Sequence, residues 1–571
     1  MRLGLRRVSL VGLLVISALS LMLAACGSTT TNGGKAPDSK QVLTRYIVAN
    51  KLDVKTVDPA VVTDFYSYFP IYLTFPGLVT LNDKLEVVPW AADSAPTVSA
   101  DGKTYTFKVK SGLKWSDGTA IDANTFAYSI NRSVDPCTAS PVGPYYLAII
   151  KDVATFSGEK CADDGKTITG KIQTLVGDSL VVSDPQTLQI TLESPAAYFP
   201  DAMTYPTSFA QPKQLIDQFG NKGWTDHLVD NGGFGGNLFK ITAWDHKGSM
   251  TLTRNDSFWG TKPVLKQINF KIYKDGDTEY ADFQSGHLDV GSPPNTQYAA
   301  AKSVAGFHEN PSLSIGYLQP NWKAAPFDDL AARQAFAIAI DKDALANQVD
   351  KGTVLPTNHI VPQGMPGYNP NLTGPDGTQN VKGDAAKALA LITDYANRKC
   401  GGKIASCPPV TLTESNDPDI VASGTAIIDM WTKNLGGYPV KLTTTDFSSL
   451  LDQAYSPNPP QIFGIGWITD YPDPQDWLSL QFSATASNNT GAVSVPEAND
   501  LMAKADANQD PTSRIQQYQQ AEQLLVTDVA WVPLSQGKQI YIVKPYVQGY
   551  SLTSLGYPTL DTWSTVYVNN H

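Results

Sequence analysis

A short apolar strand that changes abruptly into an acidic, aromatic and proline-rich segment constrains this chain more than any other feature. The strand spans residues 462–467, and the segment after it reads I-T-D-Y-P-D-P-Q-D-W. Its two prolines fix their own φ and bias the preceding residues away from helix, so we expect an ordered turn. A carboxylate just beyond a buried strand and walled by aromatic rings is suited to hold an ammonium group, and Asp470 is the candidate. We expect Asp476, directly before Trp477, to cap the next helix.

The first residues have the pattern of an export signal. The chain begins M-R-L-G-L-R-R, continues with an apolar run at residues 8–23, and reaches L-A-A-C at Cys26. A basic start, a short apolar core and small residues are typical of secretion, and sixteen residues are short for a membrane span. The L-A-A-C end resembles the bacterial lipoprotein signal, which implies removal of residues 1–25 and lipid on Cys26. A plain secreted protein with an incidental cysteine is the alternative.

The rest of the chain is predicted to be tethered and acidic. Residues 26–41 are rich in Ser, Thr, Gly and Asn, which predicts a flexible tether. The formal net charge is −11 for the whole chain, and the signal contains three arginines and no acid, which leaves −14 after cleavage. An acidic surface argues against a nucleic-acid partner.

Roughly 545 residues remain after cleavage, enough for two or three domains. No later stretch is apolar for long enough to cross a bilayer, so we expect a soluble body anchored at one end.

Four cysteines remain after Cys26, namely Cys137, Cys161, Cys400 and Cys407. An exported chain lies in an oxidising compartment, so an even number suggests two disulfides. Of the three possible connectivities we expect the local one, which joins Cys137 to Cys161 and Cys400 to Cys407. The spacings are not those of a zinc site and no histidine lies near them, so we expect no metal.

Strand and helix patterns alternate along the chain. Residues 104–110, T-Y-T-F-K-V-K, follow a D-G turn and alternate at period two, which predicts a half-buried strand. Asp122 stands where it would cap a helix in which Phe126 and Ile130 share one face. Such alternation predicts an α/β protein with more than one domain.

Several ordered strings resemble one protein family. They are P-W-A-A-D-S at 89–94, S-A-D-G-K-T-Y-T-F-K-V-K-S-G-L-K-W-S-D-G at 99–118, F-A-Y-S-I-N-R at 126–132 and W-I-T-D-Y-P-D-P at 467–474. They are similar to the extracellular solute-binding proteins of family 5, the peptide- and nickel-binding components of ABC importers, whose motif is W-x-x-D-Y-x-D/E-P. The resemblance covers nearly all of the chain from Val42 onward. It departs from the family mainly in two insertions that carry the cysteine pairs.

The resemblance implies a periplasmic-binding-protein-like α/β fold (type II, cluster C) with two lobes and an extra small domain. Both lobes are discontinuous in the family, and we assign residues 42–78, 185–312 and 535–571 to lobe I. Residues 79–184 form the expected small domain, and residues 313–534 form lobe II. The strands expected to cross between the lobes are residues 313–319 and 531–536.

The resemblance also implies which residues of lobe II contact the ligand. Asp470 matches the aspartate that receives the α-amino group of a peptide in the peptide-binding members. Gly466 and Trp467 match the strand that pairs with the ligand backbone. Tyr471 belongs to the same motif and is a further candidate contact.

Contacts from elsewhere in the chain are implied at four positions. Asp64, Phe65 and Tyr66 stand where the family places the strand that faces the ligand. Asn321 matches an asparagine in the cleft near the hinge. These residues and the lobe II motif form the expected binding site.

The function we expect is capture of short peptides without catalysis. The chain has no G-x-S-x-G, H-E-x-x-H, phosphate loop or G-x-G-x-x-G, so we expect neither an enzyme nor a cofactor. We expect a monomeric lipoprotein, on the outer face of the bacterial cell membrane or in the periplasm, that closes around a peptide and delivers it to ABC permease subunits. Alternatives are the same fold binding a nickel chelate, oligosaccharide, opine or other solute, and an exported hydrolase or structural surface lipoprotein. The W-x-x-D-Y motif favours an amine-bearing ligand over a sugar.

Overall fold

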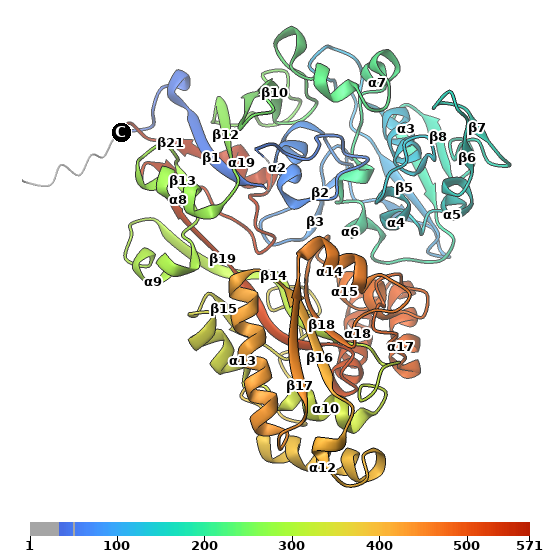
Figure 1. The fold of residues 1–571 in the computed structure, drawn as a ribbon. Helices are drawn as coiled ribbons and strands as arrows, with labels where there is room; N and C mark the ends of the chain where they lie inside the picture. Colours follow the sequence, from blue (N-terminus) through green and yellow to red (C-terminus); the bar gives the residue numbers. More distant parts are fainter. Residues whose placement is uncertain (1–33, 50–51) are drawn as a thin grey trace, which may run out of the picture.

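The computed structural model describes residues 34–49 and 52–571, and Figure 1 shows two bodies joined by long strands. The predictions of a signal peptide at residues 1–25 and of lipid on Cys26 lie outside the described residues, as does most of the predicted tether. Within the described part, no helix has the length and apolarity needed to cross a bilayer.

One large mixed sheet runs through both bodies. Its main path, in order, is β10 (Phe239–Trp244), β11 (Ser249–Arg254), β12 (Gln267–Tyr273), β1 (Val42–Val48), β13 (Val290–Gly291), β19 (Val532–Val543), β14 (Phe307–Pro320), β18 (Ile462–Ile468), β16 (Val410–Ser415) and β17 (Val440–Thr445). β15 (Val354–Pro356) pairs with β19 outside this path. In lobe I, β1 runs parallel to β12 and β13, so its C-terminal end points toward the same edge as theirs.

The two longest strands connect the lobes. β14 and β19 pair antiparallel from Phe307 with Ile542 in lobe I to Leu318 with Val532 in lobe II. The register shifts between Pro311 and Ile315, so the ladder is interrupted where the chain passes from one lobe to the other. The crossings predicted at residues 313–319 and 531–536 lie within these two strands or at their ends. A local break in a continuous ladder is a natural place for a hinge.

Helices cover the lobe II part of the sheet and enclose a core of their own. The main ones are α10 (Leu330–Ile338), α12 (Ala385–Lys399), α13 (Pro418–Asn434), α14 (Phe447–Ala454), α17 (Pro496–Ala507) and α18 (Pro511–Thr527). α10, α12, α13 and α18 each begin after an aspartate whose side chain accepts a backbone N–H of the first turn, which satisfies an otherwise unpaired donor. Phe336, Ile392, Leu412 and Trp431 are buried together between α10, α12, α13 and the sheet.

The small domain is built on a separate four-stranded sheet beside lobe I (Figure 1). Its order is β4 (Thr97–Val98), β5 (Thr104–Lys108), β9 (Thr187–Thr191) and β8 (Leu180–Asp184). The predicted strand is present as β5, and Asp122 caps α3 (Ala123–Val134) by accepting the N–H groups of Asn124 and Thr125. Phe126 and Ile130 of α3 are fully buried, as their spacing predicted. β9 lies past residue 184, where we drew the end of this domain.

Both disulfides have the local pairing expected from the sequence. Cys137, just after α3, is bonded to Cys161 at a sequence separation of 24 residues. Cys400, just after α12, is bonded to Cys407 at a separation of 7 residues. Each bond therefore closes one surface loop within its own domain.

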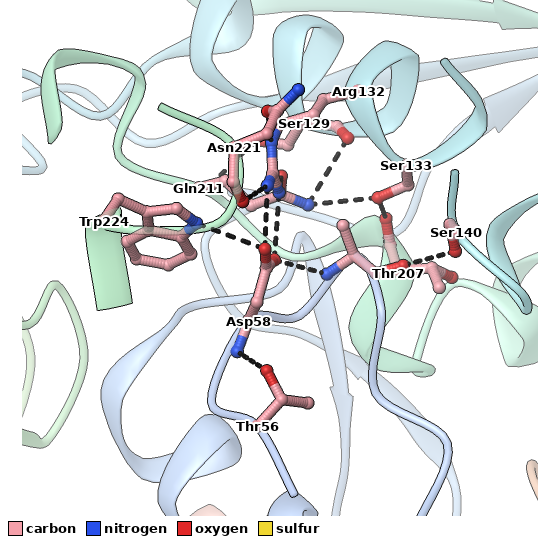
Figure 2. Close-up of polar contacts among 11 residues, drawn as sticks. Thr56, Asp58, Ser129, Arg132, Ser133, Ser140, Thr207, Gln211, Asn221 and Trp224 are labelled. Carbon is pink, nitrogen blue, oxygen red and sulfur yellow. Dashed lines mark hydrogen bonds and ion pairs between the residues drawn. The ribbon is translucent and has the colours of Figure 1, made fainter. Parts of the chain in front are cut away.

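A buried ion pair fastens the small domain to lobe I (Figure 2). Arg132 of α3 donates from Nη1 to Asp58 Oδ1 at 2.9 Å and from Nη2 to Asp58 Oδ2 at 2.7 Å. Trp224 Nε1 and the Ala60 backbone N–H also donate to this carboxylate, at 3.1 and 3.0 Å. Gln211 accepts a further bond from the guanidinium at 2.7 Å. The bidentate geometry and the additional donors satisfy both charges away from water.

Removing one partner should leave the other charge buried and unpaired. We expect Arg132→Met to lower the free energy of unfolding by about 3–5 kcal/mol. Differential scanning calorimetry should show this as a fall of several degrees in Tm.

The matched control is Arg398→Met, because Arg398 also pairs with two aspartates but its side chain is 41% exposed. This exposed pair should contribute at most about 1 kcal/mol. Equal losses of Tm in the two variants would contradict the structural role assigned to the Arg132–Asp58 pair.

Candidate functional site

A cavity of about 540 Å³ lies between the lobes. Lobe I lines it with the C-terminal end of β1, the start of α2 (Phe65–Thr74) and the start of α8 (Gly276–Gln284). Lobe II contributes Thr353, Val354 and Ile468, and the connecting strand β19 contributes residues 537–540. Both lobes and a strand that joins them therefore line the cavity. A rotation of one lobe relative to the other would change the width of the cavity.

Asp470 follows β18 at the interface between lobe II and the small domain. Its Oδ2 accepts a hydrogen bond of 2.6 Å from the hydroxyl of Tyr146, which lies on α4 (Gly143–Tyr146). Burial raises the pKa of Asp470 to about 7, and the Tyr146 hydrogen bond opposes the rise. No lysine, arginine or histidine among the described residues forms an ion pair with it. Asp470 is thus a desolvated carboxyl group that lacks a cationic partner.

Tyrosine rings surround this carboxyl group. The rings of Tyr146 and Tyr205 are stacked with centroids 3.8 Å apart, and the ring of Tyr68 meets that of Tyr205 edge-on at 5.5 Å. The rings of Tyr72 and Tyr557 are stacked at 5.2 Å. Burial raises the pKa of all five tyrosines, and the nearby charge of Asp470 adds to each rise. The faces of such rings favour a cation positioned over them.

Asp476 holds the Asp470 turn in place and does not cap a helix. Its Oδ2 accepts the Asp470 backbone N–H and Trp467 Nε1, each at 3.2 Å. It lies inside α15 (Pro474–Trp477) and is fully buried. The capping role that we predicted for it is wrong, because Pro474 takes the first helical position and the cap falls to Asp473.

Asp473 has a structural role. Besides capping α15 through the Gln475 N–H at 2.9 Å, it forms a bidentate pair with Arg514 of α18 at 2.7 and 2.6 Å. The three aspartates of the motif therefore have different contacts. Asp473 anchors the turn to α18 and Asp476 shapes it, while neither Asp476 nor Asp470 forms an ion pair among the described residues. Tyr471 is buried and bonds to Gln475, so it supports the turn from inside.

Gly466 and Trp467 lie on a strand with a partly free edge. On one side β18 pairs with β14, with Gly466 opposite Gly316 and Trp467 opposite Ile315. On the other side β16 pairs only with Ile462 and Phe463. In the described chain, residues 464–468 therefore have no strand on this edge. An extended ligand backbone can add to such an edge by main-chain hydrogen bonds.

The strand predicted at Asp64, Phe65 and Tyr66 is a helix. Asp64 is the N-cap of α2, and its Oδ1 accepts the Ser67 backbone N–H at 2.9 Å while Oδ2 accepts the Ser67 hydroxyl at 2.8 Å. An aspartate three residues before a serine is a helix-start signal, which the aromatic residues between them obscured. Phe65 and Tyr66 still line the interlobe cavity, but Asp64 does not.

Asn321 is not brought to the Asp470 site. It follows Pro320, which pairs with Ile462 at one end of the β14–β18 ladder, whereas Asp470 follows the other end at Ile468. Its side chain donates to Pro459 O at 3.3 Å and lines a different cavity of about 510 Å³. The cleft role predicted for Asn321 therefore lacks support in this structure.

The rings around Asp470 were missed from sequence. Tyr146 comes from the insertion in the small domain, and Tyr205 and Tyr557 come from distant parts of lobe I. Only the aromatic cluster at residues 65–72 carried a local signal, because it is rich in tyrosine and lacks an amphipathic period. Among residues 34–49 and 52–571, no group of three or more His, Cys, Asp or Glu side chains is arranged to hold a metal ion.

Solved structures share this architecture over almost the whole chain. Murein tripeptide binding protein MppA of Escherichia coli aligns with a TM-score of 0.72 and 23% identity, over 94% of this chain and 100% of that one. The structure of Listeria monocytogenes OppA bound to peptide aligns with a TM-score of 0.67 and 24% identity, over 93% and 99%. These likenesses confirm the predicted periplasmic-binding-protein-like α/β fold.

Comparison of the sequence with those of known proteins agrees with the structural likeness. Oligopeptide-binding protein OppA of Bacillus subtilis is 28% identical over 540 residues, which cover 93% of this chain and 94% of that protein. Dipeptide-binding protein DppE of the same organism is 27% identical over 556 residues, which cover 95% and 96%. The family model for bacterial extracellular solute-binding proteins, family 5 Middle, matches residues 86–489. The chain therefore belongs to the bacterial extracellular solute-binding proteins of family 5, as its motifs predicted.

Proposed function

We propose that this chain is the substrate-binding lipoprotein of an ABC importer and that it captures short peptides between its lobes. The observation that carries the proposal is Asp470, a desolvated carboxyl group among tyrosine rings with no cationic partner among the described residues. A peptide α-ammonium supplies the missing charge and donates hydrogen bonds, which are strong and directional in a dry site. Several relatives are named as oligopeptide- or dipeptide-binding proteins, which supports the same ligand class.

The peptide backbone has a place to bind beside Asp470. The free edge of β18 at residues 464–468 ends two residues before Asp470, and Ile468 lines the interlobe cavity. A strand-like peptide held at this edge would place its first residue near Asp470 and its remaining residues along the cavity. Main-chain bonds of this kind depend little on side-chain identity, so the site would accept varied sequences.

Closure brings lobe II against the small domain and lobe I. Contacts across the interface include Tyr146 to Asp470, Asn488 Nδ2 to the Tyr145 hydroxyl at 2.7 Å, and the Ala197 N–H to Asp506 O at 2.9 Å. Contacts of this kind, made by separate side chains and single backbone groups, can be broken when a hinge reopens. A ligand that bridges the lobes adds to them and shifts the population toward the closed form.

Closure around the peptide and anchoring of the chain at the membrane allow the peptide to be delivered to the permease. We propose that the chain catalyses no reaction, acts as a monomer, and is held by lipid on Cys26 at the outer face of the membrane or in the periplasm. The closed form then presents both lobes together to the membrane permease subunits. The match to the bacterial extracellular solute-binding proteins of family 5 supports this arrangement.

Neutralising Asp470 should weaken peptide binding. Asp470→Asn keeps the shape of the side chain and removes its charge, so we expect the Kd for tetraalanine to rise by at least about tenfold. Isothermal titration calorimetry on the purified chain measures this directly.

The control substitution is Asp429→Asn on the exposed face of α13, which should leave the Kd unchanged. Capping the peptide amine with an acetyl group should weaken binding to the wild type and add no further loss in Asp470→Asn. An Asp470→Asn variant that binds tetraalanine as tightly as the wild type does would exclude Asp470 from the site.

Peptide affinity should depend on pH with a maximum just above neutrality. Burial raises the pKa of Asp470 to about 7, so the empty site is mostly neutral below this pH and charged above it. Binding an ammonium requires the charged form, so affinity should rise with pH up to about 7.5, by at most about tenfold per pH unit. Above about pH 8 the peptide amine loses its proton and affinity should fall.

Calorimetry across this range checks the profile. Asp470→Asn should lose the acid limb and retain the alkaline one, because only the peptide amine still titrates. A wild-type profile that is flat between about pH 5.5 and 7.5 would show that Asp470 does not titrate on binding.

A further inference from the structure

The partly free edge of β18 begins at a fork between two strands. β16 and β18 run parallel and pair only at residues 412–413 with residues 462–463. Beyond these pairs β16 stays alongside β17 and β18 stays alongside β14, so the ladder between β16 and β18 ends there. The first residues past this fork are Glu414 on β16 and Gly464 on β18.

The carboxyl group of Glu414 lies over Gly464. A Cβ atom added to Gly464 would lie 2.0 Å from Glu414 Oε2 and 2.3 Å from Glu414 Oε1, so the carboxyl group occupies the space of the missing side chain. The Cγ of Glu414 lies close to Gly424 of α13, where an added Cβ atom would be 3.2 Å away. Two glycines, one on β18 and one on α13, therefore make room for this side chain.

Glu414 has no partner inside the protein. It is 5% exposed, and its carboxyl group has neither a hydrogen-bond donor nor a cation beside it within the described part of the chain. Its oxygens are not sealed off completely, in contrast to Oε2 of Glu522, which is buried without a partner. Burial raises the pKa of Glu414 to about 8, and no neighbouring group opposes the rise. Such a carboxyl group forfeits the hydrogen bonds that it would make in water, and a ligand can restore them.

The edge of β18 that leads to Glu414 is open. Gly466 and Ile468 are exposed, and they share one face of the strand with Gly464 because side chains alternate between faces. A Cβ atom added to Gly466 would meet only main-chain atoms of β14, at 3.3 and 4.0 Å. No side chain of the described residues therefore fills the space directly over Gly466, next to Glu414. A ligand side chain has room on this face.

The opposite face of β18 is apolar. Phe463 packs there with Leu450 and Ala454 of α14, and Ile465 packs against the same cluster. An extended peptide paired with residues 464–468 directs successive side chains to alternate faces of the sheet. Its side chains on one face meet α14, and those on the other face approach Glu414.

The length of the edge places the contact several residues into the peptide. Residues 464 and 468 of an extended strand lie roughly 13 Å apart, since each residue spans about 3.3 Å. Asp470 follows two residues after Ile468. A peptide whose amine is held at Asp470 therefore has its third to fifth residues, roughly, beside the fork.

We propose that Glu414 is a specificity-determining residue that binds a lysine or arginine side chain of a peptide held along β18. The basic side chain supplies the positive charge and the hydrogen-bond donors that the carboxyl group lacks. An acidic side chain at the same place is disfavoured by charge repulsion. This inference rests on the proposed function, because pairing of the peptide with β18 is what brings its side chain to the fork. It narrows the preferred ligands to peptides with a second cationic group beyond the α-amine.

The test moves a basic residue along an alanine peptide. Tetraalanine and pentaalanine carry lysine at one position at a time after the first, and each peptide is matched by one with norleucine, which has the same carbon chain without the amine. Isothermal titration calorimetry on the wild-type chain gives the Kd of each pair. At the position that faces Glu414 we expect lysine to bind at least about tenfold more tightly than norleucine. At the adjacent positions, which face α14, the two Kd values should agree within about twofold.

Three variants assign the effect to Glu414. Glu414→Gln keeps the shape of the side chain and removes its charge, so the preference for lysine should disappear. Gly464→Ala should reduce the preference, because the added methyl group takes the place of the carboxyl group. The matched control is Glu522→Gln, which should keep the preference. Glu522 is also fully buried with its pKa raised to about 8, but its carboxyl group accepts the N–H groups of Ile360 and Val361.

Three outcomes would overturn the role of Glu414. The first is equal affinity for lysine and norleucine at every position on the wild type. The second is the same gain from lysine at every position, which would reflect attraction by the net negative charge of the chain and would be screened by salt. The third is a preference that survives in Glu414→Gln. Calorimetric Tm values show whether each variant is folded, and the wild type and Gly464→Ala decide the question if Glu414→Gln is not.

Failure of the proposed function gives a different result. If neither the alanine peptides nor their lysine derivatives bind to the wild-type chain, peptide capture itself is contradicted, and the role of Glu414 with it. If the alanine peptides bind and lysine brings no gain at any position, only the role of Glu414 fails. One set of titrations therefore separates the two failures.

Discussion

The antiparallel ladder between β14 and β19 is the interaction on which the rest of the structure depends. It carries main-chain hydrogen bonds from Phe307 with Ile542 in lobe I to Leu318 with Val532 in lobe II, and no other strand pair extends as far within the described chain. The strand with the partly free edge is attached to it directly, because β18 pairs with β14. A rotation at the break between Pro311 and Ile315 therefore moves Asp470 and the free edge of β18 as one unit relative to lobe I. The strands set the geometry, and the two register shifts, between Pro311 and Ile315 and between Gly316 and Tyr317, are the places where this ladder can bend.

Some buried charged side chains of this protein form ion pairs and others do not. Arg132 with Asp58, and Arg514 with Asp473, are bidentate pairs with further hydrogen bonds, and each joins separate segments of the fold. Asp470 is less buried than these, and neither Asp470 nor Arg45 forms an ion pair among the described residues. Folding alone gains nothing from leaving such groups unpaired. Arg45 lines the interlobe cavity, whereas Asp470 lies against Tyr146 of the small domain.

The sequence allowed the fold to be predicted and singled out Asp470 as the centre of the candidate site, but it did not reveal the surroundings of that residue. Asp470 was found because it ends a short apolar strand in a recognisable motif, and the capping role of Asp122 followed from local spacing. Asp476 was assigned the cap that belongs to Asp473, since the effect of a proline at the first helical position was overlooked. Asp64 was placed in a strand because its helix begins with aromatic residues that carry no clear period. The contact of Tyr146 with Asp470 could not be predicted from sequence, because it arises only from the packing of the small domain against lobe II.

The contact between Tyr146 and Asp470 also bears on how the empty protein behaves. Without a ligand, burial favours the neutral carboxyl group, and a single tyrosine hydroxyl satisfies one of its oxygens. Empty closure therefore gains a neutral hydrogen bond, whereas closure around an ammonium gains a charge-assisted one of about twice the strength. Below about pH 7, the ligand is needed to convert Asp470 to its charged form inside the closed site. Since this difference depends on the amine and not on side chains, it favours liganded over empty closure for peptides of any sequence.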